Sequence, residues 1–546
     1  MRKLIYAIIC ICFLSQALYA QKELTQLEKL TATAKVWGFL KYYHPNVANG
    51  TYNWDQQLFD ILPKVESVKT NTELSAVFLN WINTLGKIKP CKSCSKLSKK
   101  EYFNENFDLS WIKDNSIFSG ELSNKLEYIE KNRLLKKHFY VKYGLNDEAN
   151  PINEEPYEDI GFPDLEYRLL SLFRYWNFIE YFFPHKYLTD QKWSEVLLDF
   201  IEKMLDTSII ENYQLILTEL VTKLDDSHVS IRFDKDIKFK YSSTVVKDIE
   251  GECVVFKLYN ETIAEQEDIK LGDVIIAVDD INVKDYLEKQ IKYQPASNII
   301  TKRNNVYYSL LRSDVKESLE VTIRRGDTIL NRKVDLYDFY ELYRHNLKNS
   351  SKWKIVNTDI GYVDMRLIDS EDVQEMMINL TNTKAIIFDL RGYPKFAFKQ
   401  LSRYLISEKK DFAKIMIPDL TYPGKYLFKE NDKTYNPVKN LYKGKVIILA
   451  DDQSLSLSEY AVMCLQAADN SITIGSQTAA ADGKNILFVY LGGYQTTMTS
   501  QGVFYPDGTQ TQRVGVKIDI EVKPTIKGLQ EGRDEVLEKA IEIINN

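Results

Sequence analysis

The pattern of apolar and polar positions changes twice along the chain. Residues 29–66 and 168–205 carry apolar and aromatic side chains at helical spacing. Residues 242–337 show short β-branched runs between polar turns, and from residue 352 apolar strands alternate with helical stretches. The pattern predicts a helical region, a small sheet unit and an α/β core, in that order.

The helical region contains an internal repeat. Residues 37–45 match residues 176–184, and each copy has a further tryptophan downstream, Trp54 and Trp193, at the same offset of 139 positions. We interpret the repeated aromatic residues as core rather than as a ligand-binding box, because such stripes usually bury area. Residues 86–160, between the copies, are rich in polar side chains and are expected to form a solvated connector.

The first twenty residues have a basic start, a short apolar run and a small residue at position 20, which predicts a signal peptide over residues 1–20. The run is too short for a stable membrane span. Loss of Arg2 and Lys3 takes the formal charge from -6 to -8 without leaving a long basic block, so neither nucleic acid nor an anionic membrane is indicated. We expect an exported protein, periplasmic or extracellular, that is not integral to a membrane and has polypeptide or small-molecule partners; the sequence does not indicate its oligomeric state.

Four cysteines lie beyond the predicted signal peptide, and only Cys91 and Cys94 have the spacing of a motif. A second cysteine pair and a histidine at metal-ligand spacing are both missing. A local disulfide or two free thiols are therefore expected rather than zinc, and we predict neither a metal nor an organic cofactor.

A candidate nucleophile lies between an apolar strand ending at Ala450 and a helical stretch. Here Ser454, Ser456 and Ser458 alternate before Glu459. A serine on a strand-to-helix turn presents its hydroxyl where the following N–H groups and the helix dipole favour an oxyanion. Ser456 with Glu459 three residues later is equally a helix capping box, which needs no catalysis.

This segment resembles the Ser-Ala-Ser-Ala-Ser-Glu motif of the carboxyl-terminal processing and tricorn-like serine peptidases, and the resemblance implies that Ser456 is the nucleophile. Residues 389–392 resemble the Asp-Leu-Arg-Gly segment of the same family. That likeness implies an oxyanion hole formed by the amides of Gly392 and Leu457. After Gly392 the chain reads Tyr-Pro-Lys-Phe instead of Asn-Pro-Gly-Gly, so this loop departs from the family.

The two branches of the family imply different bases. The processing branch uses a lysine 25 residues after the nucleophile, where this chain has Ala481, with Lys484 three residues later as an alternative. The tricorn-like branch uses a histidine before the PDZ region, and its Ser-His pair resembles Ser227 and His228, which implies His228 as the base. The glutamate that orients this histidine corresponds to Gln512, which can fix a tautomer but brings no charge. The histidines without a comparable context are His138, His185 and His345.

Residues 269–275 resemble the Leu-Gly-Asp turn of a PDZ domain, and the counterpart of its carboxylate-binding loop comprises Gly251, Glu252, Cys253 and Val254. A PDZ module adds an extended peptide to an open sheet edge. The expected architecture is multi-domain α+β, with a helical region at 21–235, a PDZ-like domain at 236–340 and an α/β peptidase core, similar to ClpP and crotonase, at 350–546.

We therefore expect an exported serine endopeptidase that cleaves polypeptides and binds peptide ends on the PDZ-like module. A different class remains open, a peptide-binding scaffold on a decayed peptidase fold, because of Ala481, Gln512 and Tyr393-Pro394. An esterase that uses the same serine is a third alternative, since an oxyanion hole does not specify the leaving group.

Overall fold

The structure, a computed structural model, describes residues 23–97, 100–233, 237–342 and 351–546. The predicted signal peptide and His345 lie outside these residues. Within the described ranges, no helix combines the length and the apolarity that crossing a membrane requires.

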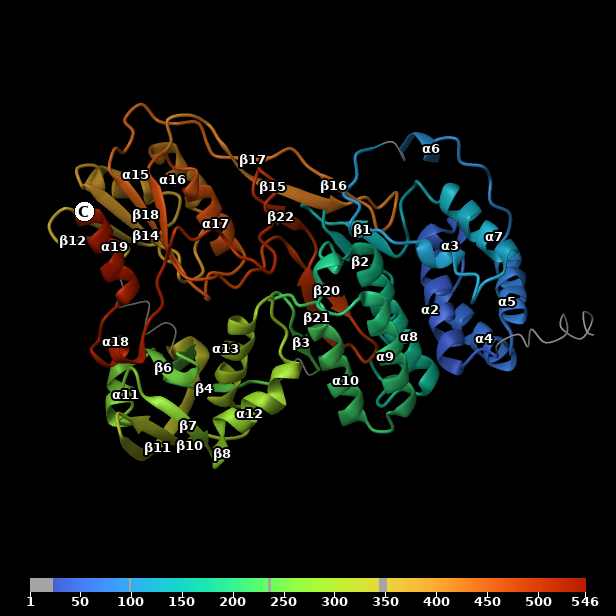
Figure 1. The fold of residues 1–546 in the computed structure, drawn as a ribbon, viewed down its shortest axis with the longest axis horizontal. Helices are drawn as coiled ribbons and strands as arrows, with labels where there is room; N and C mark the ends of the chain where they lie inside the picture. The colour runs from blue at the N-terminus through green and yellow to red at the C-terminus, as the bar shows by residue number, and fades with distance from the viewer. Residues whose placement is uncertain (1–22, 98–99, 234–236, 343–350) are drawn as a thin grey trace, which may run out of the picture.

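The N-terminal helices form one end of the molecule (Figure 1), and the two repeat copies have the same internal geometry. In the first copy the indole N–H groups of Trp37 and Trp54 each donate to the other residue's carbonyl oxygen, at 3.0 and 3.1 Å. In the second copy Trp176 and Trp193 do the same, at 2.8 and 3.0 Å. All four indoles are buried, so they act as core. The principal helices here are α2 (Gln26–Tyr43), α4 (Trp54–Ser67), α5 (Asn71–Thr84), α8 (Leu165–Phe182), α9 (Trp193–Asp206) and α10 (Ile210–Thr222).

The segment between the repeat copies is more ordered than the sequence suggested. It contains η1 (Ser110–Lys113) and α7 (Gly120–Lys131), and Leu122, Leu126 and Ile129 of α7 are buried in the helical core. The prediction of a solvated connector is wrong for this part, because these apolar residues recur every three or four positions among polar neighbours. Cys91 and Cys94 form a disulfide, as one of the two expected alternatives.

A small β-rich unit follows, with the strand order β5-β6-β7-β10-β11-β4-β9 and β8 paired to β7. The predicted Leu-Gly-Asp turn lies directly before β7, and Gly272 adopts a φ of +78° that favours glycine. Helix α13 (Ile299–Leu310) packs beside the edge strand β5. The strands are β4 (Lys240–Ser242), β5 (Thr244–Ile249), β6 (Glu252–Leu258), β7 (Val274–Val278), β8 (Ile281–Asn282), β9 (Arg312–Ser313), β10 (Ser318–Arg325) and β11 (Thr328–Asp338).

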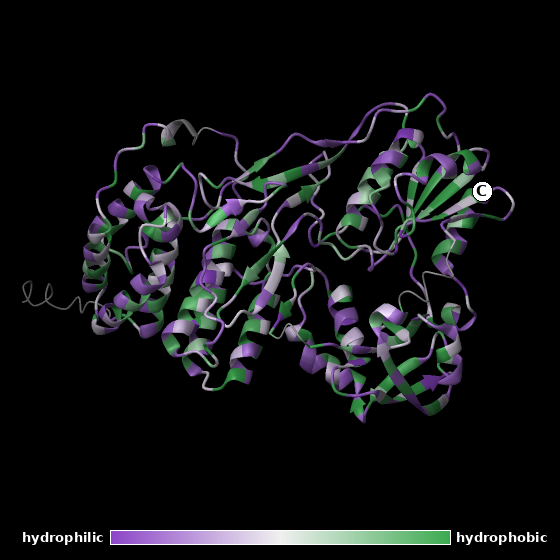
Figure 2. Cartoon of the chain, turned by 180° about the vertical axis from the view of Figure 1, so that it is seen from behind, coloured by the Kyte–Doolittle hydropathy of each residue, from purple (hydrophilic) through white to green (hydrophobic). Residues whose placement is uncertain are grey.

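The C-terminal part is built on a six-stranded sheet with the order β12-β13-β14-β18-β19-β23, parallel except at β12. Its central strands β14 and β18 are hydrophobic except at one end of each (Figure 2), as expected for a parallel sheet covered on both faces. Phe388 and Ile448 pack on one face with α17, whereas Ile387 and Ile447 pack on the other with α19. The elements are β12 (Trp353–Val356), β13 (Ile360–Asp364), α15 (Val373–Leu380), β14 (Ala385–Asp389), α16 (Phe398–Leu405), β18 (Lys445–Ala450), α17 (Leu457–Gln466), β19 (Ser471–Gly475), β23 (Ile520–Glu521), α18 (Ile526–Gln530) and α19 (Glu535–Asn545).

A hairpin from the C-terminal part enters the helical core. Strands β20 (Asn485–Val489) and β21 (Gln495–Thr499) form it, and β3 (Ile231–Arg232) pairs with β21 as a third strand. The ring centroids of Phe488 and Tyr490 lie 5.2 and 4.9 Å from that of Tyr175 on α8. The pairing of β3 with β21 brings the chain just after His228 beside residues some 270 positions later. The protein is thus a mixed α+β, multi-domain chain with a helical N-terminal region and a sheet-rich C-terminal part.

Candidate active site

Ser456 lies at the turn between β18 and α17 in an unusual backbone conformation, with φ +57° and ψ −116°. The Ser456 amide donates to the Glu459 carboxylate at 3.2 Å, which is the glutamate half of the predicted capping box. An ordinary N-cap residue is extended with negative φ, whereas this conformation costs a non-glycine residue about 1–3 kcal/mol. Helix capping therefore does not account for the turn, which has the strained strand-to-helix form typical of an exposed nucleophile.

The two outer serines of the motif have a structural task. The hydroxyls of Ser454 and Ser458 are buried, and each donates to the carbonyl oxygen of Leu390 at 2.7 Å. Leu390 follows β14 directly, so these two bonds hold the end of β14 against the turn after β18. Alternate positions along this segment thus anchor it, and Ser456 between them faces a hollow in the surface.

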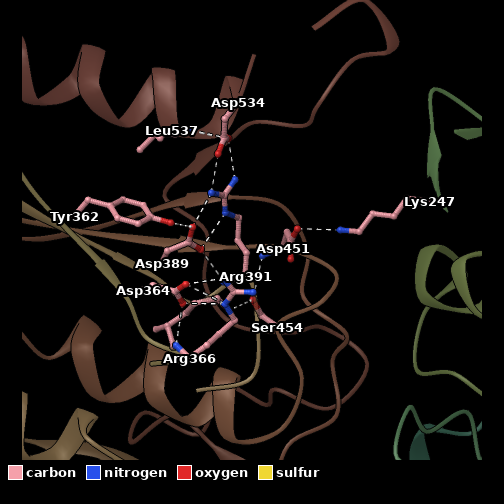
Figure 3. Close-up of polar contacts among 11 residues, drawn as sticks. Lys247, Tyr362, Asp364, Arg366, Asp389, Arg391, Asp451, Ser454, Asp534 and Leu537 are labelled. Carbon is pink, nitrogen blue, oxygen red and sulfur yellow. Dashed lines mark hydrogen bonds and ion pairs between the residues drawn. The ribbon is translucent and has the colours of Figure 1, made fainter. Parts of the chain in front are cut away.

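The Asp-Leu-Arg-Gly segment is fixed by a partly buried ion-pair network (Figure 3). Arg391 donates to the carboxylate of Asp389 at 2.7 and 3.0 Å and to both oxygens of Asp534 at 2.8 Å. Asp534 is also the N-cap of α19, and Tyr362 donates to Asp389 at 2.8 Å. Arg391 therefore ties the loop that contains Gly392 to the C-terminal helix.

Of the two backbone amides predicted for the oxyanion hole, that of Leu457 belongs to a residue that lines the hollow, whereas Gly392 is not among the lining residues. Leu457 is the first residue of α17, where amides have no partner within the helix and the dipole favours negative charge. Gly392 follows the Leu390 carbonyl that both outer serines contact. Within the described part of the chain, neither the Leu457 nor the Gly392 N–H has a hydrogen-bond acceptor.

His228 and Ser456 line the same hollow, which has a volume of about 720 Å³. Among the described contacts there is no hydrogen bond between the two side chains, and such bonds are often long until substrate binds. Burial lowers the pKa of His228, and the neighbouring Asp226 opposes this shift. The imidazole is thus neutral near pH 7, as a general base must be. The predicted alternative base, Lys484, lines the hollow too.

The imidazole of His228 is held by two residues that the sequence did not single out. Its Nδ1 lies 2.8 Å from the hydroxyl of Thr499, and that hydroxyl lies 2.9 Å from the buried carboxylate of Asp226. Asp226 also accepts from the amides of His228 at 3.0 Å and Thr499 at 2.8 Å. Asp226 was visible in the sequence two residues before His228, but nothing local signals Thr499, which the β3–β21 pairing supplies.

Ser227 and Gln512 lie beside this group without bonding the imidazole. The Ser227 hydroxyl donates to the Ala479 carbonyl oxygen at 2.7 Å and accepts from the Ser297 amide at 2.8 Å. The Gln512 amide nitrogen donates to Asp226 at 3.3 Å. The structure thus places Thr499, rather than Gln512, at the ring nitrogen, and Ser227 joins two loops.

The residues predicted to bind a peptide carboxylate form a hairpin. Gly251 is in the turn between β5 and β6, and Glu252, Cys253 and Val254 begin β6. Strand β6 is paired with β5 on one side and β7 on the other, so these residues offer no open sheet edge. Their role in peptide binding stays a prediction.

The carboxylate of Glu459 holds the turn that contains Ser456 against the segment 478–481. Its fully buried carboxylate accepts from the Thr478 hydroxyl at 2.5 Å and from the amides of Ala480 and Ala481 at 3.1 and 3.0 Å, besides that of Ser456. Burial raises the pKa of Glu459 to about 7, although these hydrogen bonds oppose the shift. The carboxyl group therefore binds a proton in the folded protein at pH values where the unfolded chain has released it.

We expect the variant Glu459→Gln to lose a pH dependence of stability. Because the folded-state pKa is raised, the stabilisation from protonated Glu459 is full below its unfolded value and is lost as the pH rises toward 7. The destabilisation caused by Glu459→Gln should therefore be smaller at pH 8 than at pH 4.5, by about 3 kcal/mol. Calorimetric unfolding of both proteins at the two pH values measures this difference, and an equal or larger destabilisation at pH 8 would contradict it.

Comparison with known proteins agrees with the fold and the motif. Residues 359–522 match the model described as peptidase family S41, so the resemblance to the carboxyl-terminal processing and tricorn-like peptidases is confirmed and supports a serine-type peptidase. No curated protein matches the sequence. Solved structures with similar folds include mature CPAF complexed with lactacystin (14% identity, TM-score 0.55, covering 70% of this chain and 99% of that one) and mature CPAF alone (13%, 0.54, 70% and 98%). The photosystem II D1 C-terminal processing protease also aligns (14%, 0.42, 66% and 97%).

Proposed function

We propose that the chain is a serine endopeptidase in which Ser456 is the nucleophile and His228 the general base. The strained turn of Ser456, facing the hollow that His228 also lines, is the observation that carries this proposal. The family match of residues 359–522 supports the same reaction class.

In the proposed reaction the Ser456 hydroxyl attacks a peptide carbonyl while His228 takes its proton through Nε2. The amides of Gly392 and Leu457 stabilise the oxyanion of the tetrahedral intermediate. The protonated imidazole then donates to the leaving amine, which frees the first product. Water, deprotonated by His228 in turn, hydrolyses the acyl-enzyme and restores Ser456.

Polypeptides fit the hollow better than small esters do. Three aromatic side chains at the hollow are largely exposed, Tyr393 at 59%, Phe396 at 69% and Tyr435 at 48%. Two of them occupy the loop where the family has Asn-Pro-Gly-Gly. Exposed aromatic groups around a cleft are typical of surfaces that bind extended chains.

We propose that the unit spanning β4 to β11 is a PDZ-like module that receives polypeptide ends; the Leu-Gly-Asp turn and the edge strand β5 beside α13 support it. Export to the periplasm or the medium rests on the predicted signal peptide, and the disulfide between Cys91 and Cys94 is consistent with an oxidising compartment.

The second candidate function is a peptide-binding scaffold on the same fold. It is favoured by the missing hydrogen bond between Ser456 and His228 among the described contacts, and by Gln512 in place of an acid. Its hollow would hold a polypeptide without cleaving it.

Covalent labelling separates the two candidates. We expect a fluorophosphonate probe to label the purified protein at Ser456, and the label to be lost in Ser456→Ala and strongly slowed in His228→Ala. Peptide and ester panels run in parallel define the leaving group. A folded protein that takes no label, yet binds unstructured polypeptide, would establish the scaffold instead.

A further inference from the structure

We infer that Asp226, acting through the hydroxyl of Thr499, is the acid that positions His228 in this protein, in the place of the residue at position 512. The inference rests on the proposed function, because it concerns the residues that orient His228 as the general base. Asp226 and Thr499 are positioning residues, since neither lines the hollow that would hold substrate.

The direction of each hydrogen bond follows from counting protons. Thr499 has one hydroxyl proton, and the carboxylate of Asp226, 2.9 Å away, can only accept. The hydroxyl oxygen must then accept from Nδ1 of His228, 2.8 Å away. Neutral imidazole that donates from Nδ1 keeps the lone pair on Nε2, which is the tautomer a base needs.

Asp226 is itself firmly held. It is completely buried, and its carboxylate accepts from two backbone amides, from Thr499 and from the side-chain amide of Gln512. A buried carboxylate with this many donors keeps its position during a proton transfer nearby. It therefore stabilises the imidazolium that forms when His228 takes the serine proton.

The same contacts explain why position 512 is glutamine. Its amide nitrogen lies 3.3 Å from Asp226, so a glutamate there would set a second carboxylate against the first. Two carboxylates at this distance in a buried site cannot both be ionised. The acid that positions His228 therefore lies at position 226, and Gln512 supplies a donor to it.

Other titratable groups near the imidazole of His228 also influence the pH profile of kcat/KM. The buried imidazole of His185 is close to Asp226 and His228, and burial lowers its pKa to about 4, so it is uncharged above pH 5. The other titratable side chains of the hollow are Lys399, Lys429, Glu430, Asp432, Tyr435, Tyr393, Tyr460, Asp482 and Lys484. None of these is altered in the variants below.

The test compares Thr499→Val with Thr499→Ser. The valine variant has no hydroxyl and should lose kcat/KM by about 100-fold or more, whereas the serine variant keeps the relay and should stay within a few-fold of the parent. Asp226→Asn should lose at least as much, and the acid limb of its kcat/KM profile should move to lower pH, because the charge that raises the pKa of His228 is gone. Thr499→Val keeps that charge, so its limb should move less.

Gln512 provides the matched control. Gln512→Glu should lower activity, although it restores the acid that the family has at this position; an increase would return the orienting role to position 512 and overturn the inference. So would parent-like kcat/KM in Thr499→Val. Thermal unfolding identifies any variant that fails to fold, and Thr499→Ser keeps the comparison valid in that case. Absence of fluorophosphonate labelling in the parent would instead remove the proposed function.

Discussion

Replacement of Ser456 by alanine is expected to abolish peptide hydrolysis and covalent labelling, with a loss of about 10⁴-fold or more in kcat. The physical reason is that neither neighbouring serine can take its place: the Ser454 and Ser458 hydroxyls are buried and donate to the Leu390 carbonyl. Hydrolysis of a peptide panel and labelling of the parent and the variant measure the loss. Residual turnover within tenfold of the parent would place the nucleophile elsewhere.

Three further variants test whether the loss is specific to the Ser456 hydroxyl: Ser454→Ala, Ser458→Ala and Ser456→Gly. Ser454→Ala and Ser458→Ala each remove one of the two donors to Leu390, so they should lower stability by about 1–3 kcal/mol while labelling at Ser456 persists. Ser456→Gly should be inactive yet no less stable than Ser456→Ala, because glycine adopts φ +57° without strain. A clearly less stable glycine variant would show that the turn is not strained.

Much of this site could be predicted from the sequence, because its signals are local. The alternating serines and the Asp-Leu-Arg-Gly segment each combine a strand end with a turn, and the chain places both at the carboxyl edge of neighbouring parallel strands, β14 and β18. In an open α/β sheet that edge is where ligands bind. The duplicated tryptophans were equally visible, since a repeat in sequence predicts a repeat in packing.

The features of the site that the sequence did not predict depend on contacts between distant segments of the chain. Thr499 contacts His228 because β3 pairs with the β20–β21 hairpin. Strand β3 has only two residues, which is too short for an alternating pattern that would predict it. The hairpin itself also depends on distant contacts, because its Phe488 and Tyr490 pack on a helix more than three hundred residues earlier. Likewise, Gln512 matched the orienting acid of the family by position, but its bond to Asp226 required the fold.

Substitution of Lys247 is expected to have the second large effect, on stability and on labelling, because this lysine joins the β-rich unit to the turn that contains Ser456. This lysine of β5 is only 5% exposed, and its ammonium lies 3.0 Å from Asp451 and 2.8 Å from Asp452, the residues that follow β18 (Figure 3 shows the contact with Asp451). Asn304 of α13 adds a bond to Asp452 at 2.7 Å. Ser456 lies five positions after Asp451, so the ion pairs fix the start of the turn that carries the nucleophile.

We expect Lys247→Met to destabilise the protein by about 3–5 kcal/mol, because it removes the ammonium that is hydrogen-bonded to the buried Asp451. The labelling rate of Ser456 should fall as well, since the turn loses its anchor. Lys316→Met is the matched control: its ammonium lies 2.8 Å from Asp279, but the lysine side chain is 52% exposed, so the loss should be at most about 1 kcal/mol. Adding Asp451→Asn and Asp452→Asn to Lys247→Met should recover part of the stability, because the uncompensated charges are then removed. Urea unfolding and probe labelling measure both effects, and equal losses for the two lysine variants would mean that burial does not set the strength of the Lys247 contact.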